Sequence, residues 1–216
     1  GPSADGRGHG AFLDATLEPL LEVCEAHRAA VAAVEVANEP GWAARASGEG
    51  SRFGPHPPWV SAHAVGELVV EGARRIARRD LRATVGFVDA RPTWLAPTAR
   101  TTLRRLADRG AYVHQRHHYP RPTRDRPAPR LPPADGSPIR PIWVGELATS
   151  RARRWPDPGL AEDDDDRYLE RRIERVRSLG YEAALVWAVR ATDAQVRWDE
   201  TTRAQLARVA AGRRTE

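Results

Sequence analysis

Residues 31 to 40 read VAAVEVANEP. The run from 31 to 37 is rich in Val, mostly apolar and of strand length, which predicts a β-strand that is buried on both faces. The stretch then ends in Asn38, Glu39 and Pro40, which bring an amide, a carboxylate and a residue that cannot donate to a strand ladder. A buried strand gains nothing from such an ending, so we interpret the end of this strand as one wall of a functional site.

Helical and strand patterns alternate along the rest of the chain. Helical periodicity predicts helices over residues 12–28, 61–79, 97–109, 167–179 and 201–211, with a start signal at Pro97 and stop signals at Gly110 and Gly180. Four more short runs of strand length lie at residues 81–89, 111–119, 139–147 and 181–189. Five strands that alternate with helices, most of them continuous apolar runs, predict an α/β fold with a parallel sheet covered by helices. We see no internal repeat and no linker, and therefore expect a single domain over residues 1–216.

The composition is that of a globular protein. The chain has 216 residues, of which 41% are hydrophobic, and this is enough to bury a core. No apolar run approaches the ~20 residues that cross a bilayer, so we expect no membrane partner. The chain shows no basic-then-apolar leader, and its localisation stays open between extracellular and cytoplasmic.

The charge permits an electrostatic partner such as nucleic acid. The formal net charge is +5, the sequence pI is about 10.2, and all 34 basic residues are Arg. Arginine clusters occur at Arg74, Arg75, Arg78 and Arg79, at Arg104 and Arg105, and at Arg171, Arg172, Arg175 and Arg177. All of them lie inside amphipathic helical patterns. Because helices that cover a sheet need a solvated face, we interpret the clusters as such faces and expect no nucleic-acid partner.

Polar and aromatic side chains collect where the predicted strands end. They are Asn38 and Glu39 after the first strand, His117, His118 and Tyr119 at the third, Glu146 at the fourth and Trp187 near the end of the fifth. In parallel α/β proteins the active site lies at this edge, because the loops that leave the strands converge there. Two carboxylates across a pocket indicate a general acid/base and a second group that acts as base or nucleophile. We interpret Asp89, at the end of the second strand, as a cap of the following turn rather than a third polar contact.

Four motifs follow one another along the chain. They are NEP at residues 38–40, His-His-Tyr at residues 117–119, the Glu146 of IWVGELATS and the Trp187 of ALVWAV. In this order they resemble the clan A glycoside hydrolases, and most closely family 5, the cellulase-like group. The resemblance implies a (β/α)8 TIM barrel, with the acid/base Glu after strand 4 and the nucleophile Glu after strand 7. Three βα units separate Glu39 from Glu146, as strands 4 to 7 of such a barrel require.

The resemblance also implies a retaining two-glutamate mechanism that cleaves β-glycosidic bonds of a poly- or oligosaccharide. Glu39 would donate a proton to the glycosidic oxygen and then act as the base that activates water. Glu146 would be the nucleophile that forms the glycosyl-enzyme intermediate. In such a mechanism the carboxyl groups lie about 5 to 5.5 Å apart, and we expect a raised pKa for Glu39 and an ionised Glu146. No metal and no other cofactor is implied.

Other positions take substrate-binding roles by the same resemblance. Asn38 would hydrogen-bond the sugar 2-hydroxyl, Tyr119 would hydrogen-bond the nucleophile, and His117 would line the same subsite. Trp187 resembles the aromatic platform under the sugar, with core packing as the alternative. For Trp42, in the loop after NEP, a role in the binding cleft and a role in packing both stay open.

The resemblance covers nearly all of this chain but only the C-terminal part of the family domain. A full barrel has eight strands and typically about 250 residues, whereas the five strands here correspond to strands 4 to 8. We therefore expect a fragment of a longer hydrolase, whose missing N-terminal segment completes the barrel. The alternatives are a partner or second copy that completes it, a carbohydrate-binding relative without turnover, and an Arg-rich nucleic-acid binder. The sugar, the linkage and the choice between internal and terminal cleavage stay open.

Overall fold

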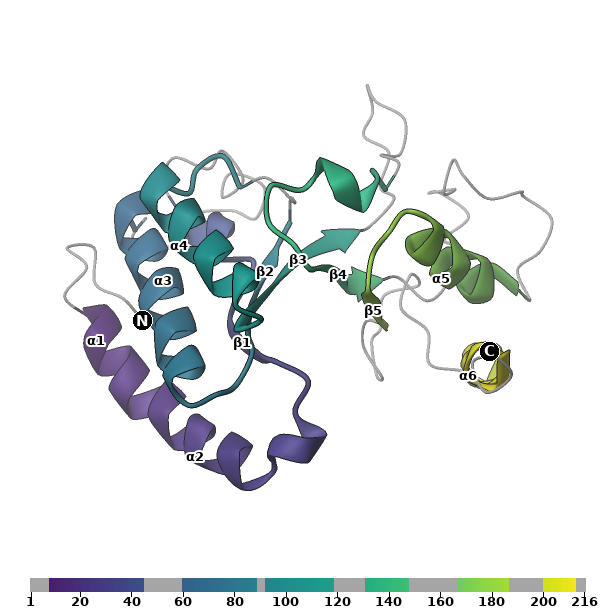
Figure 1. The fold of residues 1–216 in the computed structure, drawn as a ribbon, viewed down its shortest axis with the longest axis horizontal. Helices are drawn as coiled ribbons and strands as arrows, with labels where there is room; N and C mark the ends of the chain where they lie inside the picture. The colour runs from purple at the N-terminus through teal and green to yellow at the C-terminus, as the bar shows by residue number, and fades with distance from the viewer. Residues whose placement is uncertain are drawn as a thin grey trace. The chain divides into compact units, whose positions relative to one another are not determined.

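The computed structural model describes residues 8–44, 60–88, 92–118, 131–147, 167–186 and 200–212. Five strands form one parallel sheet in the order β1-β2-β3-β4-β5 (Figure 1). Their bounds are β1 Val34–Asn38, β2 Ala83–Phe87, β3 Tyr112–His118, β4 Ile142–Leu147 and β5 Ala183–Val186. Each strand lies within a run that the sequence predicts to be a strand, except that β1 continues one residue further, to Asn38. The expectation of an α/β fold with a parallel sheet is therefore confirmed.

Helices alternate with these strands along the chain. They are α1 Gly8–Phe12, the π-helical turn η1 Leu13–Leu17, α2 Glu18–Ala26, α3 Ala62–Arg78, α4 Pro97–Asp108, α5 Tyr168–Ser178 and α6 Glu200–Gly212. Short 3-10 turns are η2 Arg28–Ala30, η3 Pro40–Ala43 and η5 Ala134–Gly136. Among the described helices, none combines the length and the apolar character that a membrane span requires.

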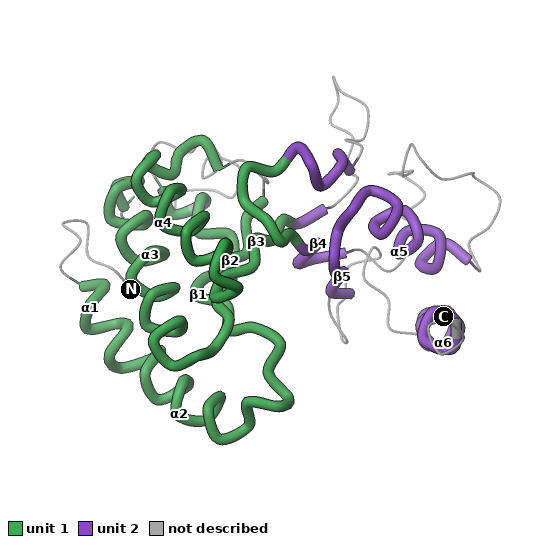
Figure 2. The backbone as a smooth tube through the Cα atoms, in the orientation of Figure 1, with its two compact units in different colours: residues 1–116, 137–142 green, residues 117–136, 143–216 purple. Residues whose placement is uncertain are grey.

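The chain forms two compact units (Figure 2). The first comprises Gly1–Arg116 and Ser137–Ile142, and the second comprises His117–Gly136 and Trp143–Glu216. The first unit contains α1 to α4, β1 and β2, and the second contains α5, α6 and β5. That residues 1–216 make a single domain stays a prediction.

The ends of the helices follow local chemistry that is visible in the sequence. The Ser61 hydroxyl accepts a hydrogen bond from the Ala64 N–H at 3.1 Å and so caps the first turn of α3. Pro97 is the first residue of α4, where its missing N–H costs nothing. Gly110 and Gly180 follow α4 and α5 with φ angles of 74° and 82°, in the left-handed region that favours glycine. The predicted stops at both glycines are thus confirmed.

Pro19 explains why the first predicted helix contains a π-helical turn. A proline inside a helix cannot donate a hydrogen bond to the carbonyl four residues before it. The chain widens just before Pro19, and the Glu18 N–H donates to the Leu13 carbonyl, five residues back. One wider turn lets α1, η1 and α2 continue in one direction despite the proline.

The core of the first unit lies between its helices and one face of its strands. We call α1, η1 and α2 together the first helical segment. The buried side chains of the core include Leu13 and Leu21 from this segment, Ile76 from α3, Leu103 from α4, and Val36, Val85 and Phe87 from the strands. Strand β2 is buried along its whole length. In β1, Val34 and Val36 are buried but Glu35 is exposed. The prediction that this strand is buried on both faces is therefore wrong, because helices of the first unit cover only the face that carries its valines.

Close packing of α3 against β1 depends on Gly72. A Cβ atom placed on Gly72 would lie 2.5 Å from Val36 Cγ1 and 3.2 Å from Val36 Cγ2. Real Cβ atoms do not approach a neighbour so closely, and Val is stiff at χ1, so the contact cannot be relieved by a rotation alone. The absence of a side chain at this position lets the helix backbone lie directly on the strand.

We expect Gly72→Ala to lower the free energy of unfolding by about 1 to 2 kcal/mol, since overpacking outweighs the gain of about 1 kcal/mol in helix propensity. Gly10→Ala in α1 is the matched control, because nothing lies within 4 Å of its added Cβ. The control should leave stability unchanged or raise it by up to about 1 kcal/mol. Urea unfolding followed by circular dichroism measures both. Equal stability changes in the two variants would contradict this account of the packing.

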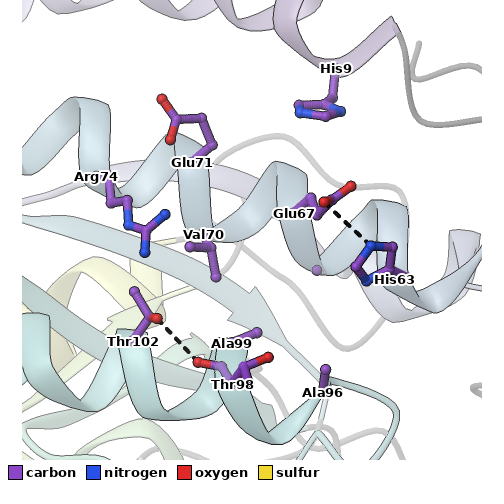
Figure 3. A pocket seen from close by; sticks show the side chains of 11 residues that line it. His9, His63, Glu67, Val70, Glu71, Arg74, Ala96, Thr98, Ala99 and Thr102 are labelled. Atoms are coloured by element: carbon purple, nitrogen blue, oxygen red, sulfur yellow. Dashed lines mark hydrogen bonds and ion pairs between the residues drawn. The ribbon is translucent and has the colours of Figure 1, made fainter.

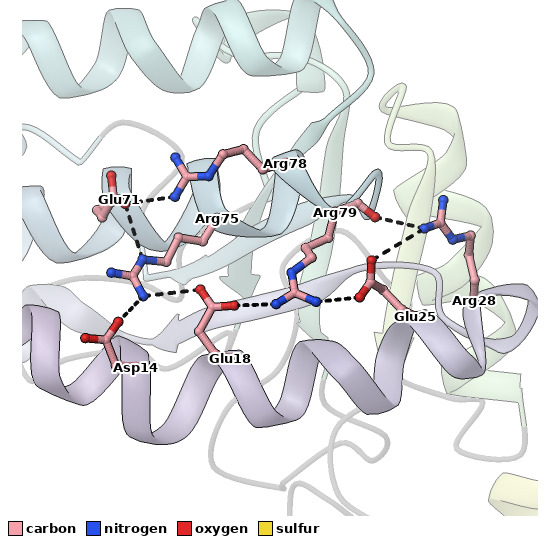
Figure 4. A network of polar contacts seen from close by, with 8 residues as sticks. All are labelled: Asp14, Glu18, Glu25, Arg28, Glu71, Arg75, Arg78 and Arg79. Atoms are coloured by element: carbon pink, nitrogen blue, oxygen red, sulfur yellow. Dashed lines mark hydrogen bonds and ion pairs between the residues drawn. The ribbon is translucent and has the colours of Figure 1, made fainter.

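An ion-pair network joins the first helical segment to α3 (Figure 4). Arg75 contacts Asp14, Glu18 and Glu71 at 2.5, 3.2 and 3.2 Å. Arg79 contacts Glu18 at 2.8 Å and Glu25 at 2.6 Å. Arg74 and Arg78 are exposed, but the Arg75 side chain is only 17% exposed. The interpretation of this cluster as a solvated face is therefore right for Arg74 and Arg78, whereas the largely buried Arg75 and the partly exposed Arg79 also bridge two helical segments.

The network also makes stability depend on pH. Burial raises the pKa of Glu71, but hydrogen bonds from Arg78 and Arg75 outweigh burial and hold it below its ordinary value of 4.5. A carboxylate with a lowered pKa binds protons less readily in the folded state than in the unfolded chain. Its stabilising contribution is thus complete above about pH 4.5 and is lost as the pH falls through the lower folded value.

We expect Glu71→Gln to destabilise the protein at pH 7 and to flatten the loss of stability below pH 4.5. The effect at pH 7 should be modest, since the Glu71 side chain is 32% exposed. Urea midpoints measured from pH 7 down to pH 3 test this. The control is Glu22→Gln, at an exposed position of α2. If Glu71→Gln and Glu22→Gln give parallel pH profiles, the network does not set the acid stability of this unit.

Candidate functional site

Glu39 follows β1 in an unusual backbone conformation. Its φ of 47° and ψ of 49° place it in the left-handed region, which few residues other than glycine adopt. The Glu39 N–H donates to the Gly86 carbonyl on β2 at 2.7 Å, and Pro40 opens the turn η3 directly after it. The side chain is half-buried. Strained residues of this kind concentrate at functional sites, where the surrounding structure holds them in place.

The two neighbouring positions of the NEP motif are only partly described. Asn38 is exposed and lies opposite Gly86 in the ladder, after a register shift between Glu35 and Asn38. Such irregularities bend a strand and change the direction of its side chains. Trp42 lies in η3, but its side chain is outside the described part of the structure, so its two proposed roles stay open.

The second unit holds a buried pair of titratable side chains. His117 Nδ1 lies 3.3 Å from Glu146 Oε2, and the two residues are 4% and 6% exposed. His117 is near the end of β3 and Glu146 near the end of β4. A buried carboxylate costs free energy unless it is paired, and the imidazole N–H supplies a donor. Both residues belong to the site that the sequence predicts, and the structure brings them together.

Several predicted residues fall outside the described residues. Tyr119 and Trp187 directly follow the described parts of β3 and β5, and Asp89 follows β2. Their proposed roles as partner of the nucleophile, sugar platform and turn cap stay predictions.

A buried arginine in the second unit is absent from the predicted site. Arg172 on α5 is 2% exposed, and its Nη2 lies 2.8 Å from His118 Nδ1 and 3.3 Å from the His118 carbonyl oxygen. Its guanidinium carbon lies 5.6 Å from the centre of the Tyr168 ring. The interpretation of the Arg171 to Arg177 cluster as a solvated face is therefore wrong for Arg172.

A signal for Arg172 was present in the sequence. The buried residues Leu169, Ile173 and Val176 have the i, i+4, i+7 spacing of the apolar side of a helix. Position 172 is i+3 of the same series, so its side chain points to the buried side. An arginine at such a position needs a polar partner in the interior. Its place on the apolar side of the helix therefore predicts burial more strongly than its membership in a basic cluster predicts exposure.

The first turn of α5 is held by α6. Arg167 at the N-cap provides no side-chain cap; instead, the Gln205 Oε1 accepts from the N–H of Leu169 at 2.7 Å and of Glu170 at 3.3 Å. Gln205 is 2% exposed. The buried Glu170 carboxylate contacts Arg208 at 2.5 Å and Arg167 at 3.2 Å. A side chain from a later helix thus replaces the local cap that the sequence of α5 lacks.

Two further polar contacts lie on β3 within the first unit. The Gln115 Nε2 donates to Glu35 Oε2 at 2.5 Å. The Tyr112 hydroxyl lies 3.2 Å from His114 Nδ1. Burial, and secondarily the Glu35 carboxylate, raise the pKa of Tyr112 far above its ordinary value of 10.0, so that its hydroxyl stays protonated. We interpret these contacts as structural, since they satisfy polar groups inside the unit.

The first unit also has a groove between α3 and α4 with a volume of about 480 Å³ (Figure 3). Its lining includes His9, His63, Glu67, Arg74, Thr98 and Thr102. His63 Nε2 lies 3.3 Å from Glu67 Oε1, and both side chains are exposed. None of the predicted site residues lines this groove, because it opens on the helical layer rather than at the strand ends.

Metal binding at the strand ends stays open. In the second unit, His117 and Glu146 offer one imidazole nitrogen and one carboxylate oxygen, which are two of the three protein ligands of a typical catalytic zinc site. The expectation that no metal takes part is therefore a prediction that needs a direct test.

Comparison with known proteins gives no match: no family model, no curated protein and no solved structure is similar to this chain. The resemblance to clan A glycoside hydrolases thus rests on the sequence motifs alone.

We expect Gln205→Leu to destabilise the second unit by about 1 to 3 kcal/mol, because two N–H groups at the start of α5 would lose their acceptor. Hydrogen exchange should accelerate at the amides of Leu169 and Glu170 in particular. Arg203→Leu, at an exposed position of the same helix, is the control. Unchanged exchange at both amides in a folded Gln205→Leu sample would show that α5 does not depend on this cap.

Proposed function

We propose that this chain is part of a (β/α)8 barrel glycoside hydrolase that cleaves β-glycosidic bonds by a retaining mechanism. The observation that carries the proposal is the buried contact between His117 and Glu146. Both side chains are withdrawn from water near the ends of β3 and β4, and a carboxylate in such a position costs free energy unless it is used or paired. A nucleophile held by an N–H donor fits this arrangement.

The strand order supports the barrel. In a doubly wound sheet the order reverses at a switch point, whereas in a (β/α)8 barrel each strand lies beside the one that precedes it. The order β1-β2-β3-β4-β5 has no reversal. The remaining three strands of the barrel would come from a longer form of this protein or from another chain.

In the proposed reaction Glu146 is the nucleophile. One of its oxygens accepts from the His117 N–H, and the other attacks the anomeric carbon of the sugar. As the new bond between Glu146 and the anomeric carbon forms, the bond to the glycosidic oxygen breaks. Glu39 gives its proton to that oxygen, and the alcohol leaves. In the second step Glu39 takes a proton from water, the water oxygen bonds to the anomeric carbon, and Glu146 is released.

The backbone at Glu39 supports its role as acid and base. A residue that transfers a proton twice must return to the same position between the steps. The hydrogen bond from the Glu39 N–H to Gly86 and the following Pro40 restrict this residue more than an ordinary loop would. Asn38 is exposed beside it, and the resemblance assigns it to the sugar 2-hydroxyl.

Activity on aryl β-glycosides and on β-glucan and β-mannan tests the proposal. We expect Glu146→Gln and Glu39→Gln to lower kcat/KM by about 10³-fold or more, since each removes a group that acts in bond making or proton transfer. Glu174→Gln, at an exposed position of α5, is the control and should retain activity. A 2-deoxy-2-fluoro glycoside should leave a covalent adduct on Glu146 that mass spectrometry locates.

The same samples decide between the alternatives. Sugar binding without hydrolysis in a folded wild-type sample would contradict the enzyme and favour a carbohydrate-binding relative. Salt-dependent retention of DNA that survives loss of both glutamates would favour a nucleic-acid binder. Loss of activity on treatment with a chelator, restored by Zn²⁺, would contradict the metal-free mechanism.

A further inference from the structure

Arg172 makes a contact that determines the protonation of its partner. Its Nη2 lies 2.8 Å from His118 Nδ1, and both residues are almost fully buried. Arginine has only donors and keeps its charge in proteins. His118 Nδ1 must therefore accept, which means that it carries no proton. A neutral imidazole with its proton on Nε2 is the form that this contact selects.

The same guanidinium nitrogen also holds the backbone of β3. Nη2 lies 3.3 Å from the His118 carbonyl oxygen. The ring and the carbonyl of one residue are thus tied to a single side chain. Because Arg172 projects from α5, the last described residue of β3 is attached to the helix as well as to its sheet.

His117 and His118 are consecutive in β3, so their side chains point to opposite faces of the sheet. His118 contacts Arg172, and His117 contacts Glu146. A rotation of the strand end about its axis would move both rings at once. By fixing His118, Arg172 restricts the direction in which His117 Nδ1 meets Glu146 Oε2.

Arg172 is itself held in place. It lies over the ring of Tyr168, one turn earlier in α5, and Gln205 of α6 caps the first turn of that helix. A planar, delocalised cation over an aromatic ring loses less freedom than a flexible one would. The chain of contacts thus runs from α6 through α5 to the end of β3.

We propose that Arg172 is a positioning residue: it holds the ring and the carbonyl of His118 and thereby orients His117 toward Glu146. The expected effect of Arg172 on catalysis rests on the proposed function. The contact of Arg172 with His118 does not depend on that function. The described contacts of Arg172 are with His118 and Tyr168, so its effect on His117 is argued through His118. A purely structural arginine would affect stability without affecting the state of either imidazole.

Two substitutions separate these roles. Arg172→Met keeps much of the side-chain volume and removes the donor, whereas Arg172→Lys keeps a charged donor on a shorter and non-planar group. Arg177→Met, at an exposed position of the same helix, is the control. The readouts are ¹⁵N spectra of the histidine rings at neutral pH, and kcat and KM on an aryl β-glycoside.

In the wild type we expect His118 to show an unprotonated Nδ1 and a protonated Nε2. Arg172→Met should give mixed tautomers at His118 and a shift of the His117 resonances, with kcat lowered by about 10- to 100-fold and KM little changed. Arg172→Lys should show smaller changes than Arg172→Met, both in the histidine spectra and in kcat. Arg177→Met should match the wild type in every readout.

A protonated Nδ1 at His118 in the wild type would overturn the inference, since arginine cannot accept that proton. Wild-type spectra and wild-type kcat in folded Arg172→Met would overturn it as well. If Arg172→Met does not fold, the wild-type spectrum and the Arg172→Lys variant still test whether Arg172 positions His118. If the wild type does not hydrolyse glycosides, the proposed function fails, while the His117 and His118 spectra decide on Arg172 independently.

Discussion

The alternation of side chains along β3 is the constraint on which the second unit's chemistry depends. Consecutive residues of a strand face opposite sides, so a single step along the backbone separates His117 from His118. One imidazole meets the carboxylate of Glu146 and the other meets the guanidinium of Arg172. The parallel sheet thereby brings a carboxylate to one face and a cation to the other, and β3 lies between these opposite charges.

This arrangement is costly in free energy, and the cost indicates function. Glu146, Glu170 and Arg172 are each at least 94% buried, and an apolar side chain of similar volume would often stabilise a protein as well or better. Glu170 meets two arginines and closes a structural network between α5 and α6. The described contact of Glu146 is different, because its partner His117 carries an imidazole rather than a guanidinium.

Local signals predicted the elements, and long-range partners account for what the sequence could not show. Strand-length apolar runs, Pro97 at a helix start and Gly110 after a helix end are read from a few neighbouring residues, and these predictions are confirmed. Glu35 in β1 and Arg172 in α5 were misjudged. In both cases the deciding fact is which face of the element meets its neighbours, and that depends on residues 50 or more positions away, such as Gln115 and His118. The same holds for the cap from Gln205.

The strained conformation of Glu39 ties the proposed chemistry to the stability of the first unit. A left-handed non-glycine residue costs of order 1 kcal/mol or more, and it persists only where surrounding contacts outweigh that cost. Here those contacts are the pairing of β1 with β2, the bond from the Glu39 N–H to Gly86, and the packing of α3 on β1 through Gly72 and Val36. The first helical segment packs on the same α3 through the Arg75 and Arg79 ion pairs. Relaxing this packing would relieve the strain at Glu39, so the rigidity of the helical layer supports the position of the proposed acid as well as the fold.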